Sequence, residues 1–173
     1  NGGRTALLWL GRDGAEQRVS YGKLASDSAR FANLLIGLGV RKGDRVAALM
    51  PRLPETLVAM LGTFKAGAVY VPIFTGFAPD AVRYRLTDSR ASVLVTHHEF
   101  RAQLPDDIPV TTICVTAPGG RRRSGDVDFA VALGAESDRF DPIPCRRDDP
   151  ATIIYTSGST GQPKGGVIAV NLL

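Results

Sequence analysis

Short apolar segments alternate with amphipathic ones between residues 45 and 96, and this alternation limits the folds open to the chain. Residues 46–50, 68–72 and 92–96 are short apolar runs, which is typical of strands buried on both faces of a sheet. Between them, residues 54–66 and a segment that starts near Pro79 carry apolar side chains at three- and four-residue spacing, which predicts helices. This order predicts a parallel sheet with crossover helices, and therefore an α/β fold.

Further elements are predicted on either side of this region. Residues 6–10 and 17–19 are expected to form a short N-terminal β-hairpin, and Ser20 is a candidate N-cap for a helix that ends at Gly39. After the alternating region we expect a strand at 111–115, a short helix at 129–133, a linker at 141–144 and a strand leading into residue 155. The length of 173 residues corresponds to a single domain, residues 1–173.

Composition excludes several classes of protein. Hydrophobic content of 44% and charged content of 22% are ordinary for a soluble globular chain, and the net charge is only +4. The basic run at 121–123 lies between glycines without interleaved aromatic residues, so we interpret it as a solvated turn and expect no nucleic-acid partner. The longest uncharged stretch, near residues 66–79, is broken by Pro72 and is too short to span a membrane. No signal peptide is visible, and a cytoplasmic protein is expected.

Cysteine and histidine are scarce. Cys114 and Cys145 are too few for a disulfide framework or a zinc site, and both are expected to be reduced and buried. His97 and His98 form the one histidine pair, but no further histidine or cysteine stands at ligand spacing, so a metal site there is not favoured.

Residues 155–165 concentrate the chemistry of the chain: their sequence is Y-T-S-G-S-T-G-Q-P-K-G. Glycines allow backbone N–H groups to converge on an anion, the hydroxyl groups add further donors, and Lys164 adds a positive charge. This composition indicates a loop that holds a polyphosphate. The spacing differs from a Walker A loop, because two residues separate Gly161 from Lys164. An ordinary surface turn, which uses the same residue types, is the alternative.

The order of these residues resembles the phosphate-binding loop of the adenylate-forming superfamily, which includes acyl-CoA synthetases and the adenylation domains of peptide synthetases. Residues 156–165 match each position of its pattern T-S-G-[ST]-[ST]-G-x-P-K-G, and residues 65–72 match a second pattern, K-A-G-A-x-Y-V-P. The resemblance covers the whole chain and implies the N-terminal part of such an enzyme. It departs from the superfamily pattern at Gly165–Gly166 and at 169–171, in the strand expected after the loop.

The resemblance also implies a reaction and a site. Superfamily members use ATP and Mg²⁺ to convert a small-molecule carboxylate into an acyl-adenylate, and a thiol such as that of CoA then displaces AMP. Lys164 would stabilise the departing pyrophosphate as the catalytic residue, and Thr156 would contact Mg²⁺ or a phosphate oxygen. The phosphate contacts implied by the loop are Thr156, Ser157, Gly158, Ser159, Thr160, Gly161 and Lys164.

A CoA site is implied by a third similarity. Residues 74–80 resemble the F-G-G-F-S-P-E segment of the acetyl- and short-chain acyl-CoA synthetases, so Phe74 and Gly76 are candidate CoA contacts. Arg101 is a further candidate, one position from an arginine that contacts a phosphate in that group. The alternative for Phe74 and Phe77 is core packing.

Three functions therefore remain open. The chain is part of an acyl-CoA synthetase, part of a carrier-loading adenylation domain, or a catalytically inactive nucleotide-binding module. Superfamily members are considerably longer and place the acyl pocket and the adenine site after the residues matched here. We therefore expect the 173-residue chain alone not to catalyse adenylation.

Overall fold

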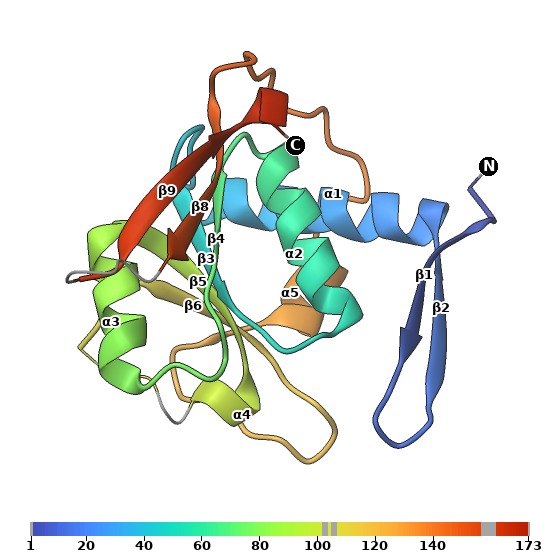
Figure 1. Cartoon of the computed structure of the whole chain (residues 1–173). Helices are drawn as coiled ribbons and strands as arrows, with labels where there is room; N and C mark the ends of the chain where they lie inside the picture. The colour runs from blue at the N-terminus through green and yellow to red at the C-terminus, as the bar shows by residue number, and fades with distance from the viewer. Residues whose placement is uncertain (1, 102–103, 105–106, 157–161, 173) are drawn as a thin grey trace.

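The computed structural model describes residues 2–101, 104, 107–156 and 162–172. Its main sheet has the strand order β7-β6-β5-β3-β4-β8-β9 (Figure 1). All neighbouring strands in it are parallel except β8 and β9, which form an antiparallel pair. The strands are β3 (Arg45–Leu49), β4 (Val69–Pro72), β5 (Ala91–His97), β6 (Thr111–Val115), β7 (Val127–Asp128), β8 (Pro150–Thr156) and β9 (Lys164–Ala169). The predicted α/β class with a parallel sheet is confirmed.

Helices cover both faces of this sheet. One face packs against α1 (Tyr21–Gly37), α2 (Pro54–Lys65) and α5 (Phe129–Ala135), which share a core with inward side chains of the central strands such as Val46 and Val95. The opposite face packs against α3 (Pro79–Asp88), whose Val82 and Leu86 contact Leu94 and Val71. A short helix, α4 (His98–Arg101), follows β5, and a 3₁₀ turn, η1 (Val170–Leu172), follows β9. Neither α4 nor β7 is predicted from the sequence.

The N-terminal hairpin forms its own two-stranded sheet. β1 (Thr5–Leu10) and β2 (Glu16–Ser20) pair in antiparallel register, as predicted, and the hairpin projects beside the start of α1 (Figure 1). Ser20 caps α1, because its hydroxyl accepts a hydrogen bond from the Lys23 backbone N–H at 3.1 Å. Trp9 ties the hairpin to the rest of the molecule by donating from Nε1 to the carbonyl of Arg52 at 2.6 Å.

A close contact between α1 and α2 depends on a glycine. A Cβ atom at Gly62 would lie 2.9 Å from the carbonyl oxygen of Ser28 and 2.7 Å from the Phe31 ring. Only hydrogen fits there, so the absent side chain at Gly62 sets how near the two helices approach. α2 ends soon after, where Gly67 adopts φ +64° and turns the chain toward β4.

The segment before β8 is held to the surface by polar contacts. The Ile143 N–H donates to the Lys65 carbonyl at 2.8 Å, and Lys42 Nζ reaches the Pro144 carbonyl at 2.8 Å and Asp149 at 2.7 Å. The hydrogen bond from Lys42 lowers the pKa of Asp149. The expectation that Cys145 is buried was wrong, because this linker runs over the surface and exposes it; Cys114, inside β6, is buried as expected.

Parallel strands bring several loops to one edge of the sheet. β3, β4, β5 and β8 all point the same way, and Tyr70 of β4 lies beside Thr152 of β8. The end of β4 at Pro72 and the end of β8 at Thr156 therefore lie at the same edge of the sheet. In open α/β sheets, ligands bind at this carboxyl edge.

Candidate functional site

The β8–β9 hairpin holds the two described ends of the predicted phosphate loop. Thr156 ends β8, Lys164 begins β9, and the two residues are register partners in the antiparallel ladder. Partners of this kind have Cβ atoms about 5 Å apart, so the two side chains start from neighbouring positions at the carboxyl edge. Both residues are exposed. Ser157, Gly158, Ser159, Thr160 and Gly161 lie outside the described residues, and their phosphate-binding role stays a prediction.

The departures from the superfamily pattern do not prevent the strand after the loop, since β9 forms across Gly165 and Gly166. Gly165 faces Tyr155 in the ladder, and a Cβ there would lie 3.2 Å from the Tyr155 ring and 2.9 Å from a methyl group of Ile153. The missing side chain leaves room for the Tyr155 ring.

Phe74 and Gly76 lie together after β4, at the same edge of the sheet. The Phe74 side chain is 67% exposed, so the core-packing alternative is wrong for this residue. Its ring meets Phe77 edge to face, with centroids 5.6 Å apart, and a Cβ on Gly76 would lie 2.5 Å from Phe74 Cε1. Glycine at 76 thus permits the observed ring position. An exposed aromatic face at a ligand-binding edge suits stacking against a planar base.

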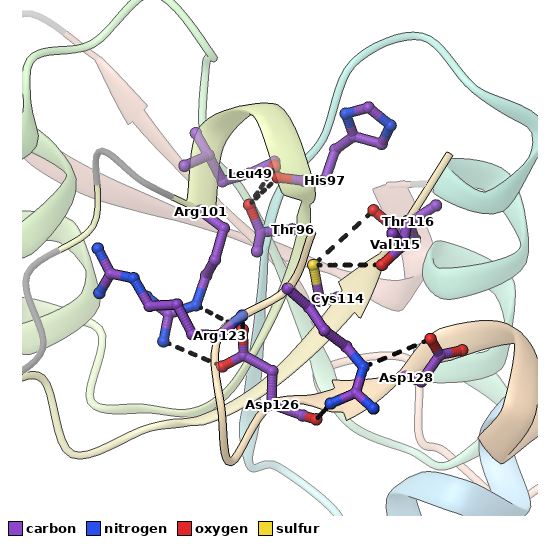
Figure 2. A network of polar contacts seen from close by, with 11 residues as sticks. Leu49, Thr96, His97, Arg101, Cys114, Val115, Thr116, Arg123, Asp126 and Asp128 are labelled. Carbon is purple, nitrogen blue, oxygen red and sulfur yellow. Dashed lines mark hydrogen bonds and ion pairs between the residues drawn. The ribbon is translucent and has the colours of Figure 1, made fainter. Parts of the chain in front are cut away.

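Arg101 is engaged elsewhere. Its Nε and one Nη atom donate to the two carboxylate oxygens of Asp126 at 2.8 and 3.0 Å, and Asp126 is only 3% exposed (Figure 2). The backbone N–H of Arg123 also donates to Asp126, while Arg122 lies 3.5 Å from Asp128. The basic run at 121–123 therefore lies in a surface loop that leads into the turn at 124–125, and contacts with two acidic residues anchor it.

The Arg101–Asp126 pair borders a cavity of about 370 Å³. Thr111 and Thr112, the first residues of β6, line it together with Ser124 and Gly125, which precede β7. The Arg101 guanidinium group thus lies near the start of β6 and β7, whereas Phe74 lies at the carboxyl edge of the sheet. The structure brings Phe74 and Gly76 together but does not place Arg101 with them.

His97, His98 and Glu99 form the one cluster of potential metal-binding groups found in the part of the chain that the structure describes. His97 Nδ1 lies 3.4 Å from a carboxylate oxygen of Glu99. Burial lowers the pKa of His97, and the neighbouring His98 lowers it further. Two nitrogen donors and one carboxylate do not match the all-oxygen environment that Mg²⁺ prefers, so the cluster is not the predicted Mg²⁺ site.

Residues of α3 that support the hairpin were not among the predicted site residues. The Tyr84 hydroxyl on α3 donates a hydrogen bond to the Pro163 carbonyl. The Asp88 carboxylate on α3 accepts one from the Tyr155 hydroxyl. Their spacing in the sequence carries no signal, because both partners are more than sixty positions away.

Within the described residues, no helix is long and apolar enough to cross a membrane.

This arrangement, a mainly parallel α/β sheet with Thr156 and Lys164 paired at its carboxyl edge, agrees with the comparison to known protein families. A model of the AMP-binding enzyme family matches residues 1–171, and the chain belongs to this family. The resemblance found in residues 65–72 and 156–165 is thereby confirmed.

Within this family, the chain is similar to enzymes named acetyl-coenzyme A synthetase. The chain is 37% identical over 185 residues to acetyl-coenzyme A synthetase from Escherichia coli K12, and 38% identical over 183 residues to that of Novosphingobium aromaticivorans. In each case the match covers 95% of this chain and 28% of the relative. The chain thus spans between a quarter and a third of the length of these relatives.

Solved structures agree. An acyl-CoA synthetase from Brucella canis superposes with a TM-score of 0.92 at 33% identity, covering 98% of this chain and 31% of that protein. The anthranilate CoA ligase AuaEII, solved with anthranoyl-AMP, gives a TM-score of 0.82 at 28% identity, with 96% and 32% covered.

Proposed function

We propose that this chain is the ATP-phosphate-binding part of an AMP-forming carboxylate–CoA ligase. In the proposed reaction, a carboxylate oxygen attacks the α-phosphorus of ATP, the bond to the pyrophosphate oxygen breaks, and an acyl-adenylate forms. The thiol of CoA then attacks the acyl carbon and AMP leaves. The observation that carries the proposal is the pairing of Thr156 with Lys164 across the hairpin at the carboxyl edge of the sheet.

Negative charge gathers on pyrophosphate as it departs, and fixed donors and cations stabilise such a transition state. Lys164 is exposed, adjacent to the loop, and can place its ammonium group against the β- and γ-phosphates. Residues 157–161 would supply backbone and hydroxyl donors to the same phosphates. Lys164 therefore acts as the catalytic cation in this proposal.

Mg²⁺ fits the same edge as a companion of ATP. Thr156 offers one hard oxygen atom, the type of donor that Mg²⁺ prefers, and its exposure at the end of β8 leaves the hydroxyl accessible. Mg²⁺ completes its shell with water and substrate phosphates in sites of this type. When bound, the ion would neutralise charge between the phosphates; the chain's own part is to present the Thr156 oxygen beside Lys164.

CoA is proposed as the thiol substrate because Phe74 presents an exposed ring where a nucleotide base could stack, with Gly76 beside it. Arg101 can contribute a phosphate contact only by leaving Asp126, so we assign it a lesser part. The similarity to enzymes named acetyl-coenzyme A synthetase supports CoA over a carrier protein. A reducing, cytoplasmic setting fits two free thiols, Cys114 and Cys145.

The central test is Lys164→Ala in the longer enzyme that contains this sequence. Loss of one charge-assisted phosphate contact should reduce the rate of ATP–pyrophosphate exchange about 10- to 100-fold. Lys23→Ala is the matched control, since Lys23 is also exposed but pairs with Asp27 on α1. Its exchange rate should equal that of the wild type. An unchanged rate in the Lys164 variant would overturn the assignment.

Two alternatives are separated by simple assays. A carrier-loading adenylation domain would transfer the acyl group to a carrier protein rather than to CoA, so the two acceptors are compared with the longer enzyme. For the 173-residue chain alone, we propose no adenylation. A clear calorimetric isotherm with Mg-ATP and no pyrophosphate exchange by the longer protein would instead favour an inactive nucleotide-binding module.

A further inference from the structure

Side chains of helix α3 contact strand β8 and the residue immediately before β9. The Tyr84 hydroxyl donates to the Pro163 carbonyl at 3.0 Å. The Tyr155 hydroxyl donates to the Asp88 carboxylate at 2.6 Å. The two tyrosine rings meet edge to face, with centroids 6.3 Å apart. One helix therefore holds the chain immediately before Thr156 and immediately before Lys164.

The Tyr84 contact restrains Lys164 through a single peptide plane. The carbonyl of Pro163 and the backbone nitrogen of Lys164 belong to the same planar unit, so fixing one fixes the other. The ring of Pro163 already fixes its own φ angle. With the carbonyl held by Tyr84, little backbone freedom remains at the residue that begins β9.

The Tyr155 contact restrains the other strand. Burial raises the pKa of Tyr155, and the hydrogen bond to Asp88 raises it further, so the hydroxyl keeps its proton at neutral pH and remains a donor. The ring lies against Gly165 of β9, where any side chain would displace it. Tyr155 is thus fixed at its tip by α3 and along its ring by the opposing strand.

A buried cation supports the same cluster. Arg85 is 4% exposed, its guanidinium carbon lies 3.9 Å from the centroid of the Phe77 ring and 5.5 Å from that of Tyr155, and Nη1 donates to the Ala81 carbonyl at 2.7 Å. Its Nε has no hydrogen-bond partner among the described residues. A buried arginine with an unpaired N–H is costly unless aromatic faces stabilise the charge. The aromatic rings on both sides meet this requirement.

We propose that Tyr84 and Tyr155 are positioning residues of the ATP site, which hold Lys164 and Thr156 in place by anchoring the hairpin to α3. The proposal rests on the proposed function, because it assigns the two tyrosines a role through residues expected to contact ATP phosphates. Neither tyrosine contacts the substrate in this assignment.

Kinetics of Tyr84→Phe in the longer enzyme provide the first test. Loss of one neutral hydrogen bond should lower the maximal rate of pyrophosphate exchange about fivefold with little change in the KM for ATP. Thioester formation from a preformed acyl-adenylate should be unchanged. Tyr21→Phe is the matched control, because Tyr21 is an exposed tyrosine at the start of α1. Equal losses in both half-reactions would indicate general damage and overturn the proposal.

A double-mutant cycle tests whether Tyr84 acts through Lys164. Adding Tyr84→Phe to Lys164→Ala should cause almost no further loss, since the group being positioned is already gone. A full additional fivefold loss would contradict the positioning role.

Hydrogen exchange of the 173-residue chain provides a test independent of catalysis. Backbone amides of 164–166 should exchange several times faster in Tyr84→Phe and in Tyr155→Phe than in the wild type, while amides of α1 and α2 stay unchanged. Unchanged hairpin amides would overturn the anchor. If the wild-type enzyme shows no pyrophosphate exchange, the proposed function fails. The hydrogen-exchange experiment still decides whether α3 anchors the hairpin.

Discussion

The central strands and the β8–β9 hairpin belong to one sheet but are built differently. Most of β3, β4 and β5 is buried between helices on both faces, whereas the first four residues of β9 are exposed. The hairpin is joined to β4 by a short parallel pairing around Tyr70 and Thr152, and to α3 by side chains. The central strands thus supply stability, and the hairpin supplies exposed groups that a ligand can reach.

The largest difference between these regions should appear in core truncation. Leu94 on β5 is buried against α3, so Leu94→Ala should lower the free energy of unfolding by about 3 kcal/mol through lost contacts and a new cavity. Val167→Ala on β9, where the side chain is 61% exposed, should change it by less than about 0.5 kcal/mol. Urea denaturation of both variants measures the difference, and similar losses would contradict the contrast.

A smaller effect is expected where α1 and α2 meet. Gly62→Ala should destabilise the fold by roughly 1–3 kcal/mol, because the added methyl group collides with the Ser28 carbonyl and the Phe31 ring. Gly37→Ala is the matched control: it lies in α1 with open space around its Cβ position, and should stabilise by roughly 0.5–1 kcal/mol. Stability changes of opposite sign for the two variants, measured by thermal or urea unfolding, would confirm that packing rather than helix propensity determines the effect of the substitution at residue 62.

The smallest expected effect is a dependence of stability on pH near pH 6 that arises from His97 at the end of β5. Burial and the nearby His98 lower the pKa of His97, although Glu99 and Glu55 oppose this. The unfolded chain therefore binds more protons than the folded chain near pH 6, so stability rises with pH and falls as pH drops below about 6.5. His97→Gln should flatten this slope between pH 5 and 7.

The hairpin provides the control for this slope. Tyr155 has a raised pKa and stays protonated throughout the same range, so Tyr155→Phe should retain the wild-type slope. The assignment to His97 would be wrong if the slope of stability against pH disappeared in the Tyr155 variant or persisted unchanged in the His97 variant.

The same contrast explains what could be predicted from the sequence. The central strands and helices follow local rules, such as apolar runs for β3 to β5 and prolines at the start of α2 and α3, and their predicted places agree with the structure. The parallel arrangement followed from their order. The order of residues in 156–165 and 65–72 predicted the family without any tertiary information, and the family is confirmed.

Predictions that depended on distant partners were less successful. Arg101 was proposed as a CoA phosphate contact from the resemblance alone, and its pairing with Asp126, 25 positions further along the chain, carries no local sequence signal. For Phe74, core packing stood as the alternative to a CoA contact, because hydrophobicity does not reveal which side of a turn faces water. Tyr84 and Asp88 gave no local signal, since their role depends on how α3 is placed against the hairpin.

The position of β9 at the end of the sheet has a consequence for how the chain behaves in solution. Its outer backbone groups have no neighbouring strand within the described residues, and Val167 adds an exposed apolar side chain. Such an edge is a template for additional β-pairing, including association between copies of the same chain. Isolated preparations should therefore self-associate as concentration rises, and Val167→Lys should keep them monomeric, which sedimentation at increasing concentration measures.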